Sequence, residues 1–181
     1  MPRGTRSEQI QGATWCATLS VMPVLLRKML GLGSLPEAIR ADLAGEQLIH
    51  LAQFVPVTFR FAGHVPGKVA KGNIRSYVGA LAFTDKRVIA VLSAGPKTAR
   101  KTIDQLWSAP PGTMVRATID EDGLLLNCPN MGAISKSFTG SMSLRYKTSL
   151  SPDVLAQLPA RQLSFDVSRK YVYLACDMPS C

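Results

Sequence analysis

Residues Tyr77–Ser93 read YVGALAFTDKRVIAVLS, and this stretch decides the fold. Two apolar runs, Tyr77–Phe83 and Arg87–Leu92, flank the short polar link Thr84–Lys86. Apolar residues occupy both faces of each run, which is typical of strands in the centre of a sheet. The stretch therefore predicts an antiparallel hairpin that is covered on both sides.

Further period-two segments extend this hairpin into a larger sheet. They alternate apolar and polar residues, as half-buried strands do, and Asp122-Gly123 marks a hairpin turn between two of them. Because the strands do not alternate with long helices, a doubly wound α/β fold is not expected. We predict a mainly β protein with minor helix, a bent antiparallel barrel or sandwich of eight or nine strands. The additional expected strands are Val57–Phe61, Lys97–Trp107, Val115–Ile119, Leu124–Asn127, Met142–Lys147, Leu163–Val167 and Tyr171–Ala175.

Two helices are expected before the sheet. Val21–Leu30 has one strongly apolar face, which packs either on its own domain or on a membrane or partner surface. Ser34–Glu37 has the spacing of a capping box, and the helix that it begins ends at Gly45. The chain therefore divides into a tail with a short apolar helix over residues 1–33 and a β-rich domain over residues 34–181.

A third short helix, Pro152–Leu158, is expected near the end of the chain. Ser151 stands directly before it and can cap it, and Pro159 follows it. It is the only helix expected after the first β-strand.

The positive charge of the chain is concentrated in one third of its length. The 181 residues carry a net charge of +9. Leu51–Lys101 contains nine Lys or Arg and only one acidic residue, Asp85, which is a net charge of +8. Such a field favours phosphates, anionic lipid or an acidic protein partner, although a merely solvated basic face has the same composition.

The cysteines and the apolar segments indicate the cellular context. No CxxC pair occurs among the four cysteines, and both histidines lie far from them, so no metal site is expected. Scattered cysteines favour reduced, mostly buried thiols in a cytoplasmic protein, with a Cys176–Cys181 bond as the alternative in an oxidising compartment. The best membrane candidate, Ala13–Leu26, is shorter than the roughly 20 residues that a spanning helix needs.

Catalytic motifs are missing from the sequence. It has no G-x-S-x-G, no GxGxxG and no GxxxxGK[ST] pattern, and its one acidic cluster, Asp120–Asp122, lacks the spacing of a calcium loop. A triad could draw its base only from His50 or His64. No catalytic residue and no cofactor is therefore predicted.

The glycine-rich segment Gly63–Asn73 is the best candidate for an anion site. It reads as a flexible loop between two strands, in which glycines let the backbone approach an anion and basic side chains donate charge-assisted hydrogen bonds. Basic residues on the next turn are expected to converge from the same end. The candidate anion- or lipid-binding residues are Lys68, Lys71, Arg75, Lys86, Arg87 and Lys97.

The hairpin Tyr77–Ser93 resembles the second hairpin of bacterial pleckstrin-homology-like and GRAM-type domains. Those domains commonly carry the pattern G-x-L-x-L-T-x-x-R-L-I, and Leu43–Phe61 is similar to their lead-in and first strand. The resemblance implies a small bent barrel that is closed by a C-terminal helix. It also implies a binding module that contacts anionic lipid through its first inter-strand loop, or a protein. The matching residues here are Gly79, Leu81, Thr84, Arg87 and Ile89.

Three functions remain open at this point. The first is a non-catalytic module that binds an anionic membrane surface, peripherally, or a protein partner. The second is a nucleic-acid-binding barrel, which is less favoured because aromatic residues are only 7% of the chain and alternate as core residues do. The third is a small-ligand barrel or an enzyme whose site forms only in three dimensions.

Overall fold

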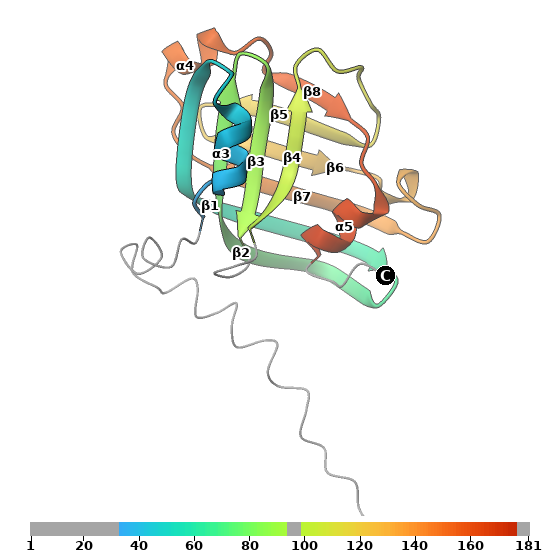
Figure 1. The fold of residues 1–181 in the computed structure, drawn as a ribbon. Coiled ribbons are helices and arrows are strands. Elements are labelled where there is room, and N and C mark those ends of the chain that lie inside the picture. The colour runs from blue at the N-terminus through green and yellow to red at the C-terminus, as the bar shows by residue number, and fades with distance from the viewer. Residues whose placement is uncertain (1–32, 94–98, 177–181) are drawn as a thin grey trace, which may run out of the picture.

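Eight antiparallel strands form a single sheet that curls into a nearly closed barrel (Figure 1). The computed structural model describes residues 33–93 and 99–176. The strand order is β4-β3-β2-β1-β7-β6-β5-β8, which confirms the prediction of a mainly β antiparallel barrel. The strands are β1 (Leu48–Val65), β2 (Lys68–Thr84), β3 (Arg87–Ser93), β4 (Ala99–Leu106), β5 (Val115–Asp120), β6 (Gly123–Cys128), β7 (Thr139–Lys147) and β8 (Gln162–Phe165).

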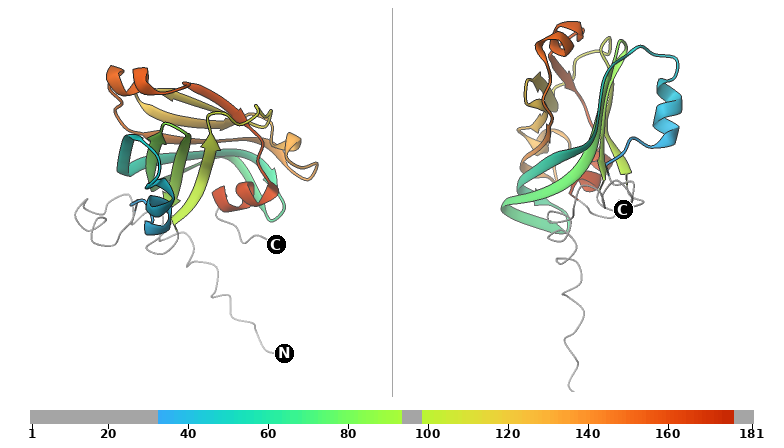
Figure 2. Two further views of the ribbon diagram at one scale, coloured as in Figure 1. Left: turned by 45° about the horizontal axis from the view of Figure 1, so that its top comes forward. Right: turned by 90° about the vertical axis from the view of Figure 1, so that its left-hand side faces the viewer.

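Strand β1 belongs to both halves of the barrel. Its whole length pairs with β2, while residues Val57–His64 also pair with β7. Strand β3 pairs with β2 only over residues 78–83. We therefore call β1 to β4 the first half-sheet. The second half-sheet consists of the start of β2, the end of β1, and β7, β6, β5 and β8 (Figures 1 and 2).

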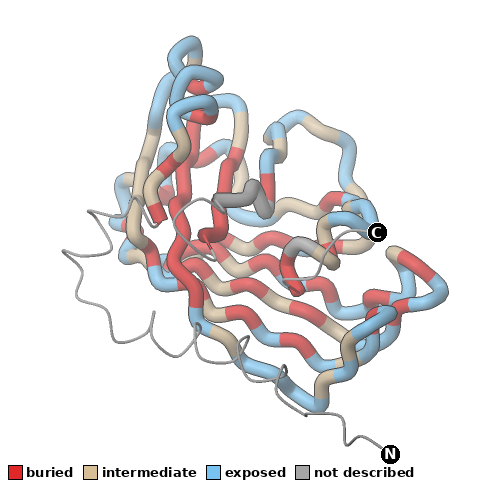
Figure 3. The backbone as a smooth tube through the Cα atoms, turned by 60° about the horizontal axis from the view of Figure 1, so that its bottom comes forward, coloured by how far each residue is buried: buried red, intermediate tan, exposed pale blue. Residues whose placement is uncertain are grey.

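Side chains fill the inside of the barrel. The alternation of buried and exposed residues along the strands of the second half-sheet is visible in Figure 3. The interior therefore holds one continuous apolar core, and its largest fully buried side chains are Tyr146, Phe59, Phe61, Phe83 and Phe138.

Helix α3 (Glu37–Leu43) covers the outer face of the first half-sheet (Figure 2). Its buried residues Ile39 and Leu43 pack on that face, which explains why the hairpin β2–β3 is apolar on both sides. The expected capping box is wrong, because the helix begins at Glu37 and Pro36 is its N-cap without a side-chain hydrogen bond. The backbone of Leu35 instead donates to the side chain of Gln53 on β1.

The two remaining helices lie at opposite ends of the barrel (Figure 1). Helix α4 (Pro152–Gln157) is capped by Ser151, whose hydroxyl accepts from the N–H of Val154, so this prediction is confirmed. Residues Tyr171–Ala175, expected to be a strand, belong instead to helix α5 (Arg169–Ala175). The reason is the spacing of the buried residues: Val172, Ala175 and Cys176 recur at three and four positions, as on one helix face.

The segment Gly63–Asn73 is a hairpin and not a flexible loop. Strands β1 and β2 continue through it and leave only a tight turn at Pro66-Gly67, where Gly67 has a φ of 87°. Gly63 faces Gly140 on β7, and a Cβ atom on Gly63 would lie 2.0 Å from the carbonyl oxygen of Thr139. The two glycines therefore let β7 pack closely against the hairpin.

Some predictions fall outside the described residues. These are the tail with its helix Val21–Leu30, the candidate Lys97 and the Cys176–Cys181 alternative, since Cys181 is not described. Within residues 33–93 and 99–176, none of the helices has the length and apolar character needed to cross a bilayer.

His50 on β1 provides a pH-dependent test of the barrel. Its ring stacks on Phe83, and its Nε2 is buried without a hydrogen-bond partner among the described residues. Burial lowers the pKa of His50 from its ordinary 6.5, so the unfolded chain binds the proton more tightly. We expect the free energy of unfolding, measured with denaturant, to decrease as the pH falls below 6.5. The free energy of unfolding of the His50→Phe variant should decrease less over the same pH range. An equal decrease in both proteins would show that His50 does not cause this pH dependence.

Candidate functional site

Three segments that are distant in sequence meet at one end of the barrel, which we call the hairpin end. They are the turn between β1 and β2, the loop around the 3-10 helix η1 (Met131–Ala133), and helix α5. The Lys68 ammonium donates to the carbonyl of Cys176, just after α5, at 2.5 Å. The rings of Phe138 and Tyr173 meet edge to face with centroids 5.6 Å apart, which joins the loop to α5.

The charged side chains of the three segments, among the described residues, are all positive. The three segments, residues 63–76, 129–138 and 167–176, contain no Asp or Glu. Exposed cations on adjoining segments raise the local potential and attract anions from solution. The six basic residues of the hairpin end are Lys68, Lys71, Arg75, Lys136, Arg169 and Lys170.

Two of these cations face the inside of the hairpin. Lys68 pairs with the buried Val65 and Arg75 pairs with the buried Phe59, so their half-buried side chains lie on the inner face. Both charges act on Cys176: burial raises the pKa of its thiol, and the two cations oppose that rise. Lys68 therefore links the hairpin to α5, in addition to contributing charge.

Lys71 lies on the opposite, outer face of the hairpin and is exposed. Val69, two residues before it, has the same orientation and is 72% exposed. Val69 pairs with His64 and Lys71 pairs with Ala62, all exposed residues. An exposed apolar side chain next to an exposed lysine is typical of a surface that docks on an anionic partner.

Lys86 and Arg87 lie beyond the other end of β2, so these two candidates do not converge with Lys68 and Lys71. Successive turns of an antiparallel meander alternate between the two ends of a sheet. The Lys86 ammonium lies 3.4 Å from the carbonyl of Gly45. The Arg87 guanidinium binds Glu46 through two of its nitrogens, and it also reaches Asp104 at 3.4 Å.

The environment of Glu46 shows that Arg87 stabilises the fold. The side chain of Glu46 is only 4% exposed and also accepts from the hydroxyl of Thr84 at 2.7 Å. Its burial raises the pKa of Glu46, but the hydrogen bonds from Arg87 and Thr84 outweigh burial and leave it lowered. The Arg87 guanidinium therefore forms its ion pairs within the protein, with Glu46 and Asp104.

Sequence reasoning missed Lys136, Arg169 and Lys170. They stand far from the basic third of the chain, and only the fold joins their segments to the hairpin. Arg169 and Lys136 line one open pocket together with the hydroxyl-bearing residues Ser135 and Ser137. A usable signal existed, since both late segments contain basic residues and no acidic ones.

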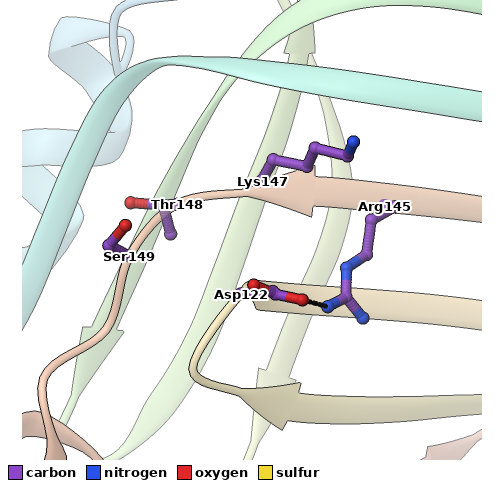
Figure 4. A pocket seen from close by; sticks show the side chains of 5 residues that line it. All are labelled: Asp122, Arg145, Lys147, Thr148 and Ser149. Atoms are coloured by element: carbon purple, nitrogen blue, oxygen red, sulfur yellow. Dashed lines mark hydrogen bonds and ion pairs between the residues drawn. The ribbon is translucent and has the colours of Figure 1, made fainter.

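A different pocket lies beside the β5–β6 turn (Figure 4). Its Arg145 guanidinium makes two hydrogen bonds to Asp120, at 2.9 and 3.0 Å, and a third to Asp122 at 3.2 Å. Lys147 supplies the other positive charge among the lining residues. Because the acids balance these cations, this pocket does not share the uniform charge of the hairpin end.

The geometry also bears on the two alternative functions. Phe59, Phe61 and Tyr77, the aromatic residues nearest the basic hairpin, are all buried, so they offer no stacking surface to nucleic-acid bases. His50 contacts Phe83, and His64 is exposed on the hairpin. Among the described residues, neither histidine has a hydrogen bond to a carboxylate.

Comparison with known proteins adds no relative. No family model, no curated protein and no solved structure matches this chain. The resemblance to pleckstrin-homology-like domains therefore depends on the residues of Tyr77–Ser93 and on a nearly closed antiparallel barrel that is compatible with that fold.

Proposed function

We propose that this chain is a non-catalytic binding module of pleckstrin-homology-like architecture that docks its hairpin end on an anionic lipid surface. One observation carries the proposal: the three segments that meet at the hairpin end contain six basic and no acidic residues among those described, and they include the exposed Val69. The three segments involved are joined by the contacts of Lys68 with Cys176 and of Phe138 with Tyr173.

Electrostatics and apolar burial act together in such docking. A basic residue near an anionic leaflet contributes about 1 kcal/mol, which decreases within a Debye length of roughly 8 Å at physiological salt. Val69 adds an apolar contact at the level of the headgroups, and its energy does not depend on salt. Binding should therefore weaken with salt without vanishing.

Vesicle cosedimentation tests the proposal. We expect the full chain to sediment with phosphatidylserine-containing vesicles, more strongly at low salt, and to stay in solution with neutral vesicles. The double variant Lys71→Glu/Lys136→Glu should weaken binding at least about tenfold, because it reverses two charges at the hairpin end. The matched control is Lys86→Glu/Lys147→Glu, which changes the net charge equally but lies elsewhere.

Two results would contradict docking through the hairpin end. One is no sedimentation with anionic vesicles even at low salt, where exposed charges attract most strongly. The other is an equal loss in both double variants, which would show that only total charge matters. Circular dichroism of each variant confirms that the barrel is intact.

A further inference from the structure

A groove crosses the outer face of the second half-sheet, beside the hairpin end. It has a volume of about 300 Å³ and lies where β2, β1, β7 and β6 run next to one another. Ile74, which is 61% exposed, and the exposed Ala62 form an apolar part of its lining. Unlike the outer face of the first half-sheet under α3, this face is lined by exposed and half-buried residues.

The polar part of the groove consists of hydrogen-bond donors. Arg60, Ser143 and Asn127 stand directly opposite one another on β1, β7 and β6, so they form one row on the outer face. Arg116 on β5 continues the row beyond Asn127 and is exposed. No acidic residue lines the groove, and Arg60 has no ion pair with any other residue of the described chain.

The spacing of this row indicates an extended ligand. Strands β1, β7 and β6 each have a neighbouring strand on both sides. Their backbone N–H groups therefore form the hydrogen bonds of the sheet and cannot bind a phosphate together. The side-chain donors instead follow one another at the strand spacing of about 4.8 Å. Arg60 and Arg116 are three such spacings apart, or about 14 Å.

An extended peptide matches these distances. Its residues rise about 3.3 Å each, so two acidic residues four positions apart project from one side about 13 Å from each other. A guanidinium binds a carboxylate through two parallel hydrogen bonds, and the intervening Ser and Asn side chains can bind the peptide backbone. An apolar residue two positions before the first acid projects from the same side and would cover Ile74.

We propose that this groove binds an extended acidic segment of a protein partner, with one carboxylate on Arg60, a second on Arg116 and an apolar side chain on Ile74. The groove adjoins the hairpin end and shares Gly72 and Ile74 with it, but its row of polar side chains lies on β1, β7 and β6. The inference does not depend on membrane docking.

A synthetic peptide provides the test with the full-length chain. The probe has two glutamates four residues apart and a leucine two residues before the first. Amide NMR spectra of the protein detect even millimolar binding. We expect the peptide to shift the resonances of Arg60, Ser143 and Asn127, and the same peptide with glutamines to leave them in place.

Variants then separate the groove from total charge. Arg60→Glu should weaken binding of the peptide about tenfold or more, and Ser143→Ala should weaken it about threefold. Lys147→Glu, which changes the charge as much as Arg60→Glu, should have little effect.

The inference is overturned if no groove resonance moves, if the glutamine peptide binds equally, or if Lys147→Glu weakens binding as much as Arg60→Glu. It is also overturned if Arg60→Glu abolishes vesicle binding while the peptide does not bind, since the groove would then serve lipid. Vesicle binding without peptide binding refutes only this inference, and peptide binding without vesicle binding refutes only the proposed function.

Discussion

Replacing Gly79 with alanine is expected to lower the free energy of unfolding by about 3 kcal/mol. Gly79 lies on β2 between Val55 and Leu92 of the neighbouring strands. A Cβ atom there would be 2.4 Å from the carbonyl oxygen of Val91 and 2.8 Å from the ring of Tyr146. Because the nearest atom belongs to the backbone of β3, a change of rotamer cannot relieve the clash. Urea denaturation monitored by circular dichroism measures the loss.

Gly45 offers the matched control for this substitution. A Cβ atom on Gly45 would meet no atom within 4 Å, so Gly45→Ala should change the free energy of unfolding by no more than about 0.5 kcal/mol. Equal stabilities of the Gly79→Ala and Gly45→Ala variants would show that β2 and β3 can separate without cost at this point. The barrel would then be looser than its packing indicates.

Arg87→Met is expected to destabilise the fold by about 3 kcal/mol at neutral pH. The substitution removes the cation from Glu46, whose side chain is 4% exposed and would keep only the hydroxyl of Thr84 as a hydrogen-bond donor among the described residues. Leaving a buried carboxylate without its cation is costly, and this cost exceeds the net benefit of the pair itself. The double variant Glu46→Gln/Arg87→Met should recover part of the loss.

The same pair determines a pH dependence. The pKa of Glu46 is lowered in the folded protein from its ordinary 4.5, so its contribution to stability is present above pH 4.5 and is lost as the pH falls through the folded pKa. Arg87→Met should remove this acid-side loss. Arg145→Met is the control: its partners Asp120 and Asp122 are 45% and 87% exposed, and we expect a loss of at most about 1 kcal/mol. A comparable loss in both variants would contradict the special role of Glu46.

The barrel could be predicted from local patterns because its central strands carry strong ones. Tyr77–Ser93 is apolar on both faces because α3 covers one face and the barrel interior the other. The start of β2 was missed because Lys68–Ser76 is rich in small and polar residues, and a register shift near Gly72 interrupts its period. Helix α5 was missed because its Tyr and Val residues also favour strands. Only the burial of Val172 and Cys176, four residues apart, distinguishes the helix from a strand.

The site could be predicted only in part. The composition grouped Lys68, Lys71 and Arg75 on one loop, whereas they lie on strand β2, and it could not show that two of them face inward and one outward. That difference follows from the pairing of each residue with Phe59, Ala62 or Val65 on β1. Lys136 and Arg169 come from segments that meet the hairpin only in the folded chain, and no local pattern links them to it.

The shared strand β1 also affects how the protein reaches its native state. Strands β1 to β4 follow one another along the chain, so their pairing closes only short loops. The pairing of β1 with β7 joins Val57 to Tyr146 and must wait until the intervening chain has been ordered. We expect the meander to form early and the barrel to close late and slowly, with the outer edge of the hairpin exposed to other chains until then.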